Sequence, residues 1–197
     1  MNKNLFAAAL AAALALPAHA VTFEGAATQG ATTVVDYSAM GLMSFDIDFA
    51  NAAPAVLSFR IESGDVAGGQ PITLNAVLRN FAGLGFGGYQ FAFDNAVFGT
   101  IGTVTRQFGG STQIGVVGRT ATFSFNTPEF LDVEVGNPLG TTAGAIDWTL
   151  TGVRAGDRVN LRVSVVPEPG GYALMLAGLA ALGFIARRQS SRQGRRG

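Results

Sequence analysis

The chain has 197 residues, and only 13% of them are charged, against about 25% in ordinary soluble domains. It contains no cysteine, so disulfides, cysteine-bound metals and thiol catalysis are excluded, and its low charge argues against intrinsic disorder. The 13 basic and 13 acidic residues balance to a net charge of zero, which gives no sign of the basic surface that nucleic-acid binding needs.

The first 20 residues have the pattern of a secretory signal peptide. Lys3 lies in a short polar start, residues 5–16 are apolar without interruption, and the segment ends in Ala18-His19-Ala20. Small residues at the first and third positions of such a tripeptide, here Ala18 and Ala20, are typical of a signal cleavage site. The sequence therefore predicts a signal peptide at 1–20, cleaved after Ala20, and signal peptidase as a partner.

Residues 21–164 predict one all-β domain. Apolar and polar residues alternate along many short runs, which is typical of strands with one buried and one solvated face. Glycine-rich turns separate these runs, and no window shows helical spacing with capping residues. About ten such strands indicate an antiparallel β-sandwich that is jelly-roll-like, with a closed barrel or a β-solenoid as open alternatives. We expect strands at 43–49, 57–62, 121–126, 131–135, 146–151 and 159–165, with weaker candidates at 32–37, 72–80, 89–93, 100–108 and 113–117.

The C-terminal segment combines three features in order. Val166-Pro167-Glu168-Pro169 comes first, and an apolar run follows at 170–186. As a helix that run is roughly 25 Å long, near the lower limit for crossing a bilayer. Arg187 and Arg188 then open a cluster of five arginines, which holds its side of a span in the cytoplasm. We therefore expect a transmembrane helix at 170–186 and a basic tail at 187–197, with Arg187 and Arg188 as the membrane stop.

This order of features resembles the PEP-CTERM protein-sorting signal, whose tail is also labelled an ice-binding-protein C-terminal domain. Residues 172–179 are similar to the usual helix start of that family, and the resemblance covers a sorting segment at 165–197. It implies a Gram-negative exporter in which a membrane-embedded exosortase recognises Pro167, Glu168 and Pro169 and removes the helix. The inner membrane is then a transient anchor, and the product goes to the cell surface or the exopolysaccharide matrix.

Loss of residues 1–20 removes Lys3 and His19, so the remaining domain has no histidine, cysteine or lysine. Serine–histidine catalysis, lysine Schiff bases and histidine-bound zinc are therefore excluded within it. Two carboxylates can still hydrolyse a glycosidic bond, but no motif singles out a pair, and most acids are expected on solvated strand faces. We expect no enzyme activity, no cofactor and no metal. The carboxylates of the domain are Glu24, Asp36, Asp46, Asp48, Glu62, Asp65, Asp94, Glu129, Asp132, Glu134, Asp147 and Asp157.

A few residues in the domain suggest binding roles. Asp46 with Asp48, and Asp132 with Glu134, each share one face of a strand and could contribute oxygens to a calcium site, although no calcium loop is recognisable. Trp148 is expected in the core. Tyr89 follows the glycine-rich stretch 83–88 and either stacks on a sugar ring or packs at the start of a strand.

These observations favour an exported cell-surface or matrix protein whose β-domain is structural or adhesive. The alternatives are a carbohydrate-binding module for exopolysaccharide and, less favoured, a glycosidase that uses two carboxylates. The domain itself carries 12 acids and seven arginines, a net charge of −5. That charge disfavours anionic partners, nucleic acid among them.

Overall fold

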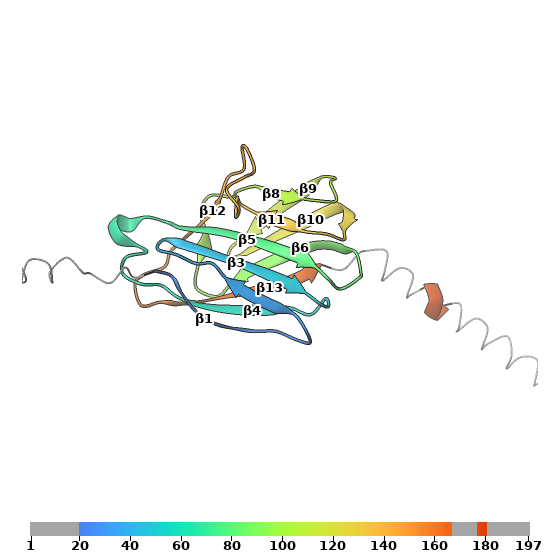
Figure 1. The fold of residues 1–197 in the computed structure, drawn as a ribbon, viewed down its shortest axis with the longest axis horizontal. Helices are drawn as coiled ribbons and strands as arrows, with labels where there is room; N and C mark the ends of the chain where they lie inside the picture. Colours follow the sequence, from blue (N-terminus) through green and yellow to red (C-terminus); the bar gives the residue numbers. More distant parts are fainter. Residues whose placement is uncertain (1–19, 167–176, 181–197) are drawn as a thin grey trace, which may run out of the picture.

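Strands make up about half of the residues that the structure describes, and nearly all of its regular secondary structure. The structure is a computed structural model and describes residues 20–166 and 177–180. Within these ranges it contains 13 strands, one short 3-10 turn, η1 (Ala67–Gly69), and a helical stretch at 177–180. The strands form two sheets that lie one on the other (Figure 1). The all-β prediction is confirmed, and the jelly-roll-like arrangement stays a prediction.

The first sheet has six strands in the order β1-β4-β13-β6-β10-β9, and all of its pairs are antiparallel. β13 lies in the middle of this sheet, so the last strand of the domain is held on both sides. The bounds are β1 Thr22–Ala27, β4 Ala55–Arg60, β13 Arg158–Val166, β6 Phe86–Phe93, β10 Thr120–Glu129 and β9 Thr112–Val117.

The second sheet has seven strands, and one of its pairs corrects the wholly antiparallel prediction. The order is β2-β3-β5-β11-β8, and β12 joins β5 to β7. β3 and β5 run parallel, because the chain crosses to the first sheet as β4 before it returns as β5. The bounds are β2 Thr33–Asp36, β3 Leu42–Phe49, β5 Ile72–Asn80, β7 Val97–Phe98, β8 Val104–Arg106, β11 Val133–Val135 and β12 Trp148–Thr151.

Aromatic rings from both sheets meet in the core. Phe45 of β3 contacts Phe59 of β4 and Phe91 of β6, with ring centroids 6.1 and 6.3 Å apart. Trp148 of β12 is fully buried, packs against Phe123 of β10 at 5.3 Å, and donates its indole N–H to a backbone carbonyl oxygen. Each such side chain removed from water stabilises the fold by about 1.5–3 kcal/mol. The prediction that Trp148 belongs to the core is confirmed.

Each expected strand overlaps one observed strand, and β1 and β7 were missed. Alternation is interrupted in β1 because a bulge at Gly25 shifts its register against β4. β7 has only two residues. The glycine-rich stretch 83–88 is partly strand, since β6 begins at Phe86. A Cβ at Gly88 would lie 1.9 Å from the carbonyl oxygen of Phe123, so only glycine lets these two strands approach each other.

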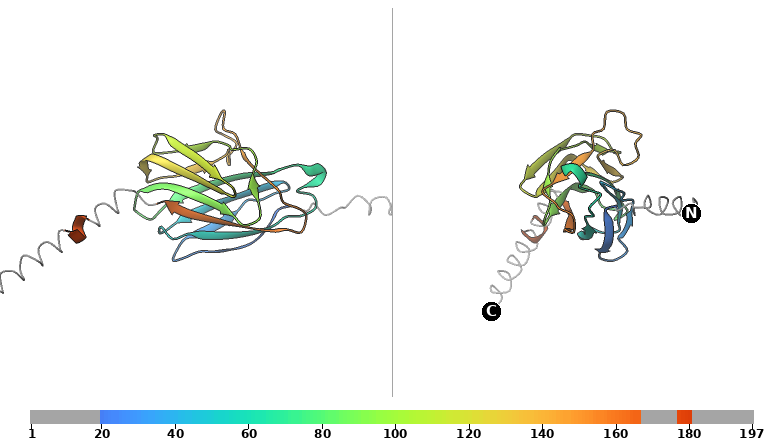
Figure 2. Two further views of the ribbon diagram at one scale, coloured as in Figure 1. Left: turned by 180° about the vertical axis from the view of Figure 1, so that it is seen from behind. Right: turned by 90° about the vertical axis from the view of Figure 1, so that its left-hand side faces the viewer.

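The two ends of the sandwich are formed by different loops (Figure 2). We call the end at which β13 finishes the exit end; loops 81–85, 107–111 and 130–132 lie there. The opposite end, which we call the far end, contains loops 37–41, 61–71 and 152–157. β13 includes the first two residues of the predicted sorting segment, so the domain leads into that segment at the exit end.

Candidate functional site

The exit end is the candidate site because the sorting segment begins there. Val166, the last residue of β13, pairs with Gly88 of β6. Two residues earlier in β6, Phe86 pairs with Glu129, the last residue of β10. The end of β13 is therefore two positions along β6 from the end of β10. Of the predicted processing residues, only Ala20, the last residue of the predicted signal peptide, lies among the described residues; Ala18, Pro167, Glu168, Pro169, Arg187 and Arg188 lie outside them.

A buried ion pair lies beneath the surface of the exit end. Glu129 and Arg106 have side chains that are 0% and 1% exposed, and Arg106 Nε donates to Glu129 Oε2 at 3.2 Å. The other guanidinium nitrogens donate to oxygens of Ser111, Asn126 and Thr127. Because every arm of the guanidinium has an acceptor, the desolvation cost of the two charges is offset by hydrogen bonds.

The Glu129 carboxylate also fixes the backbone of two loops. Its Oε2 accepts a hydrogen bond from the Phe108 N–H at 3.2 Å. Its Oε1 accepts one from Phe130 N–H and one from Leu131 N–H, both at 3.0 Å. One buried side chain thus holds loops 107–111 and 130–132 in place while the side chains of those three residues project outward.

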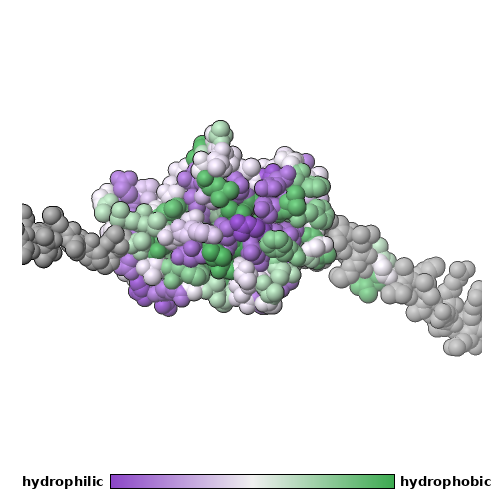
Figure 3. All heavy atoms as spheres, in the orientation of Figure 1, coloured by the Kyte–Doolittle hydropathy of each residue, from purple (hydrophilic) through white to green (hydrophobic). Residues whose placement is uncertain are grey.

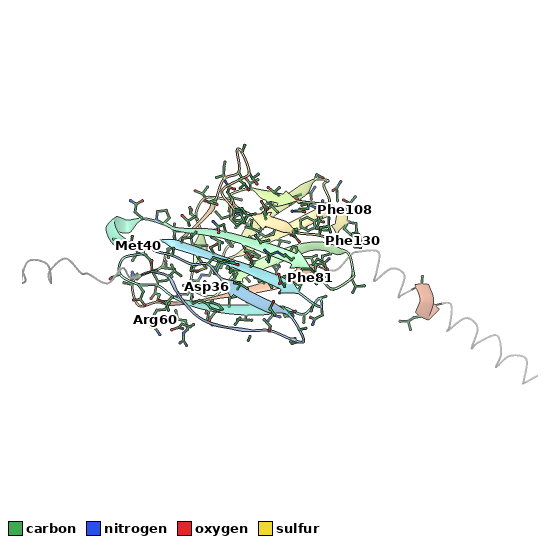
Figure 4. The ribbon with its side chains drawn as sticks, viewed as in Figure 1. Asp36, Met40, Arg60, Phe81, Phe108 and Phe130 are labelled. Atoms are coloured by element: carbon green, nitrogen blue, oxygen red, sulfur yellow. The ribbon has the colours of Figure 1, made fainter. Side chains whose placement is uncertain are left out.

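Large apolar side chains are exposed at the exit end. Phe108 and Phe130 meet edge to face at 5.7 Å, and Phe81 is 66% exposed. Asn80 joins loop 81–85 to this group, because its side-chain amide donates to the carbonyl oxygens of both Leu84 and Glu129. Figure 4 shows Phe81, Phe108 and Phe130 together at the right-hand end of the domain. We call the following group the exit cluster: Phe81, Leu84, Phe108, Phe130 and Leu131.

Three of the acids considered for calcium surround a single arginine instead. Arg79 Nη2 lies 2.6 Å from Asp46 Oδ2 and Nη1 lies 3.0 Å from Asp48 Oδ1, while its Nε is 3.9 Å from Asp132 Oδ2. Asp46 and Asp48 do share one face of β3. Glu134 does not take part in this network; its carboxylate accepts a hydrogen bond from the hydroxyl of Thr142. In residues 20–166 and 177–180, no group of three or more acidic or histidine side chains is placed to hold a metal ion.

The charged side chains around Arg79 shift one another's pKa values. Burial raises the pKa of Asp132, and the nearby Asp48, Glu129 and Asp46 carboxylates raise it further against the opposing effect of Arg79. Burial alone would lower the pKa of Arg79, but its hydrogen bonds to Asp46 and Asp48 outweigh that effect and raise it. The arrangement is an ion-pair network in which a guanidinium occupies the position between the carboxylates.

Tyr89 is not a sugar-stacking residue, which corrects one of the two interpretations of this side chain. Its ring is fully buried between Phe49 and Phe125, at centroid distances of 5.6 and 6.1 Å. Burial raises the pKa of its hydroxyl, and the Glu129 charge adds to the shift. Tyr89 packs in the core as the fourth residue of β6, so the strand start expected at this position lies three residues earlier, at Phe86.

The far end presents charged groups and a small groove. Glu24 accepts hydrogen bonds from Arg158 at 2.6 Å and from Arg60 at 2.8 Å, and these lower its pKa, with the Arg158 bond contributing most. A groove of about 270 Å³ lies between loops 61–71 and 152–157. This is below the 300–1,000 Å³ of ordinary ligand pockets.

Two features of the exit end were not singled out from the sequence. Most acids were expected on solvated faces, and Glu129, which is 0% exposed, is an exception. Asp65, in loop 61–71 of the far end, is another, since it is 2% exposed and accepts hydrogen bonds from two backbone N–H groups. The exposed phenylalanines of the exit cluster, Phe81, Phe108 and Phe130, are the second feature. A usable signal was present: Phe81 directly follows the expected strand at 72–80 and Phe108 ends the weaker candidate at 100–108, and each lies close to a turn glycine, Gly83 or Gly109.

The sorting assignment is supported by comparison with known families. The PEP-CTERM protein-sorting motif matches residues 165–189, which include the Pro167-Glu168-Pro169 tripeptide and the two arginines at 187 and 188. This motif implies export and a membrane-anchored intermediate. No curated protein and no solved structure matches the chain. Among the residues that the structure describes, no helix is long and apolar enough to cross a membrane; most of the predicted span lies outside them.

Proposed function

We propose, starting from the PEP-CTERM protein-sorting motif that this chain carries at 165–189, that the protein is an exosortase substrate. The signal peptide at 1–20 directs export, and the span at 170–186 anchors the precursor in the inner membrane. Exosortase then acts at Pro167, Glu168 and Pro169 and frees the β-domain for the cell surface or the extracellular matrix. Signal peptidase, exosortase and the inner membrane are the partners of this route.

The role proposed for the β-domain is structural or adhesive, without catalysis. A glycosidase needs one protonated and one ionised carboxyl on either side of a bond, about 5–9.5 Å apart. Asp46 and Asp48, which lie on one face of β3, are both paired with Arg79, and Glu129 forms a buried ion pair with Arg106. These ion pairs support a structural role for the three carboxylates.

The carbohydrate-binding alternative has less support. The aromatic residue considered for it, Tyr89, lies in the core. A domain whose role is to be presented at the cell surface instead needs a stable fold and a processed C-terminus. The observation that carries the proposal is the match to the sorting motif, which begins in the last two residues of β13 and continues beyond the domain.

The test is the conservative substitution Glu168→Gln in the producing cell. We expect the variant to accumulate as an uncleaved, membrane-bound form, because the acid lies within the tripeptide that exosortase would read. The control is Glu134→Gln, which changes an acid of the domain and leaves the sorting segment intact. Fractionation and immunoblotting measure both. Normal release of the Glu168→Gln protein would refute the processing role.

A further inference from the structure

We propose that the exit cluster is a membrane-contact surface that lies in the lipid headgroup layer while the precursor is anchored. The occupant is the outer surface of the bilayer itself. This inference rests on the proposed function, because it requires the anchor at 170–186.

The length of the connection brings the exit end to the membrane. Only Pro167, Glu168 and Pro169 separate Val166 from the apolar run that starts at Gly170. Four residue steps, even fully extended, span at most about 14 Å. The headgroup layer on each side of the hydrocarbon core is itself roughly 5–8 Å thick. An anchored precursor therefore holds the end of β13 near the headgroups, while the domain is still free to tilt about that point unless its surface binds the membrane.

The strand register places the exit cluster around the same point. Val166 pairs with Gly88, and the neighbouring Phe86–Glu129 pair leads directly to Phe130. In Figure 3, apolar residues coloured green appear at the right-hand end of the domain, the end at which β13 finishes. The surface that the tether brings to the bilayer is thus the surface on which the five large apolar side chains are exposed.

The chemistry of the exit cluster suits lipid. Several large apolar side chains that are exposed together on one part of a domain mark a contact surface. Phenylalanine and leucine are among the residues that bury their side chains at the boundary between headgroups and acyl chains. The three loops at 81–85, 107–111 and 130–132 contain no lysine or arginine and one acid, Asp132. The contact is therefore apolar and does not depend on anionic lipid.

The exit cluster is also held rigidly. Phe108, Phe130 and Leu131 are all hydrogen-bonded through their backbones to the buried carboxylate of Glu129. Substitution of their side chains leaves those bonds in place. A surface ordered before contact loses little conformational entropy when it meets the membrane.

The experiment uses the full chain reconstituted in phosphatidylcholine nanodiscs. Because the chain has no cysteine, one environment-sensitive fluorophore can be attached at Leu84→Cys, in the exit cluster, or at Met40→Cys, at the far end. The two positions are matched, since each residue is 62% exposed. Lipids with a nitroxide on the headgroup then quench any fluorophore that lies near the membrane surface.

We expect loss of emission from the label at position 84 and none from the label at position 40. The variant Phe81→Ser/Phe108→Ser/Phe130→Ser should recover the emission at position 84, with the fluorescence of the buried Trp148 reporting that it is folded. Phe81→Ser alone is the second variant, and it should recover part of the emission. Quenching that the serines leave unchanged, or equal quenching at positions 84 and 40, would overturn the membrane contact.

Three further outcomes separate a failure of the membrane contact from a failure of the anchor. If the label at 84 is shielded only in discs that hold more than one chain, the exit cluster binds a second copy, and the inference fails. If the chain does not remain with the discs on gel filtration, the anchor is wrong and the proposed function fails with it. Stable anchoring without quenching at 84 overturns the inference alone.

Discussion

The two ends of the sandwich use arginine–glutamate pairs in different ways. At the exit end, Glu129 and Arg106 are buried and organise two loops whose apolar side chains face outward. At the far end, Glu24 bridges Arg60 and Arg158, whose side chains are 42% and 59% exposed. The same pair of residue types thus fixes two loops at the exit end, where water is excluded, and forms a solvated charge cluster at the far end. The difference shows that burial, rather than residue type, decides what an ion pair contributes.

The largest effect that would test this comparison is expected from Glu129→Gln. The substitution removes the negative charge beside Arg106 and places an amide N–H₂ where backbone N–H groups now donate. Breaking one side of a buried pair in this way costs about 3–5 kcal/mol. Urea unfolding of the purified protein measures the loss. Glu24→Gln is the matched control, and it should change the free energy of unfolding far less because its partners are solvated.

A smaller effect is expected at Asp132, and it has the opposite sign. Because the pKa of Asp132 is raised in the folded state, its contribution to stability is full below the unfolded value of 3.8 and is lost as pH rises through the folded pKa. Asp132→Asn should therefore stabilise the protein at pH 7 and leave stability unchanged at pH 3. The side chain is 34% exposed, so solvent screens the effect to less than about 1 kcal/mol. Thermal melts at several pH values test this, and a variant destabilised at pH 7 would contradict it.

The smallest effect on stability is expected in the exit cluster. Phe108→Ser changes an exposed side chain, and such substitutions usually fall within about 0.5 kcal/mol. The buried Phe45→Ala is the contrasting variant and should cost about 3–5 kcal/mol. Chemical unfolding of both proteins measures the difference. A large loss in Phe108→Ser would mean that the ring is needed for the fold and is not free to make an external contact.

The sequence predicted the strands well because alternation reports burial directly. Residues 43–49 alternate without a break, and the structure buries Met43, Phe45, Ile47 and Phe49 completely. Alternation does not report which strands become neighbours, so the parallel pairing of β3 with β5 was not predictable. It also says nothing of long-range polar contacts. Glu129 and Arg106 are 23 positions apart, and only the fold brings them together.

The sorting segment was predictable for a different reason. Its tripeptide, apolar run and arginines are consecutive in the chain, so their order can be read without any tertiary structure. The exit cluster, by contrast, is assembled from three loops that are separated in sequence. No local pattern links Phe81 to Phe130.

The most direct test of the proposed sorting route is the intact mass of the protein released by the producing cell. We predict a polypeptide that begins at Val21 and ends at or beside Pro167-Glu168-Pro169, without the apolar run and the arginine tail. A released protein that still carries residues 187–197, or that still begins at Met1, would contradict this route.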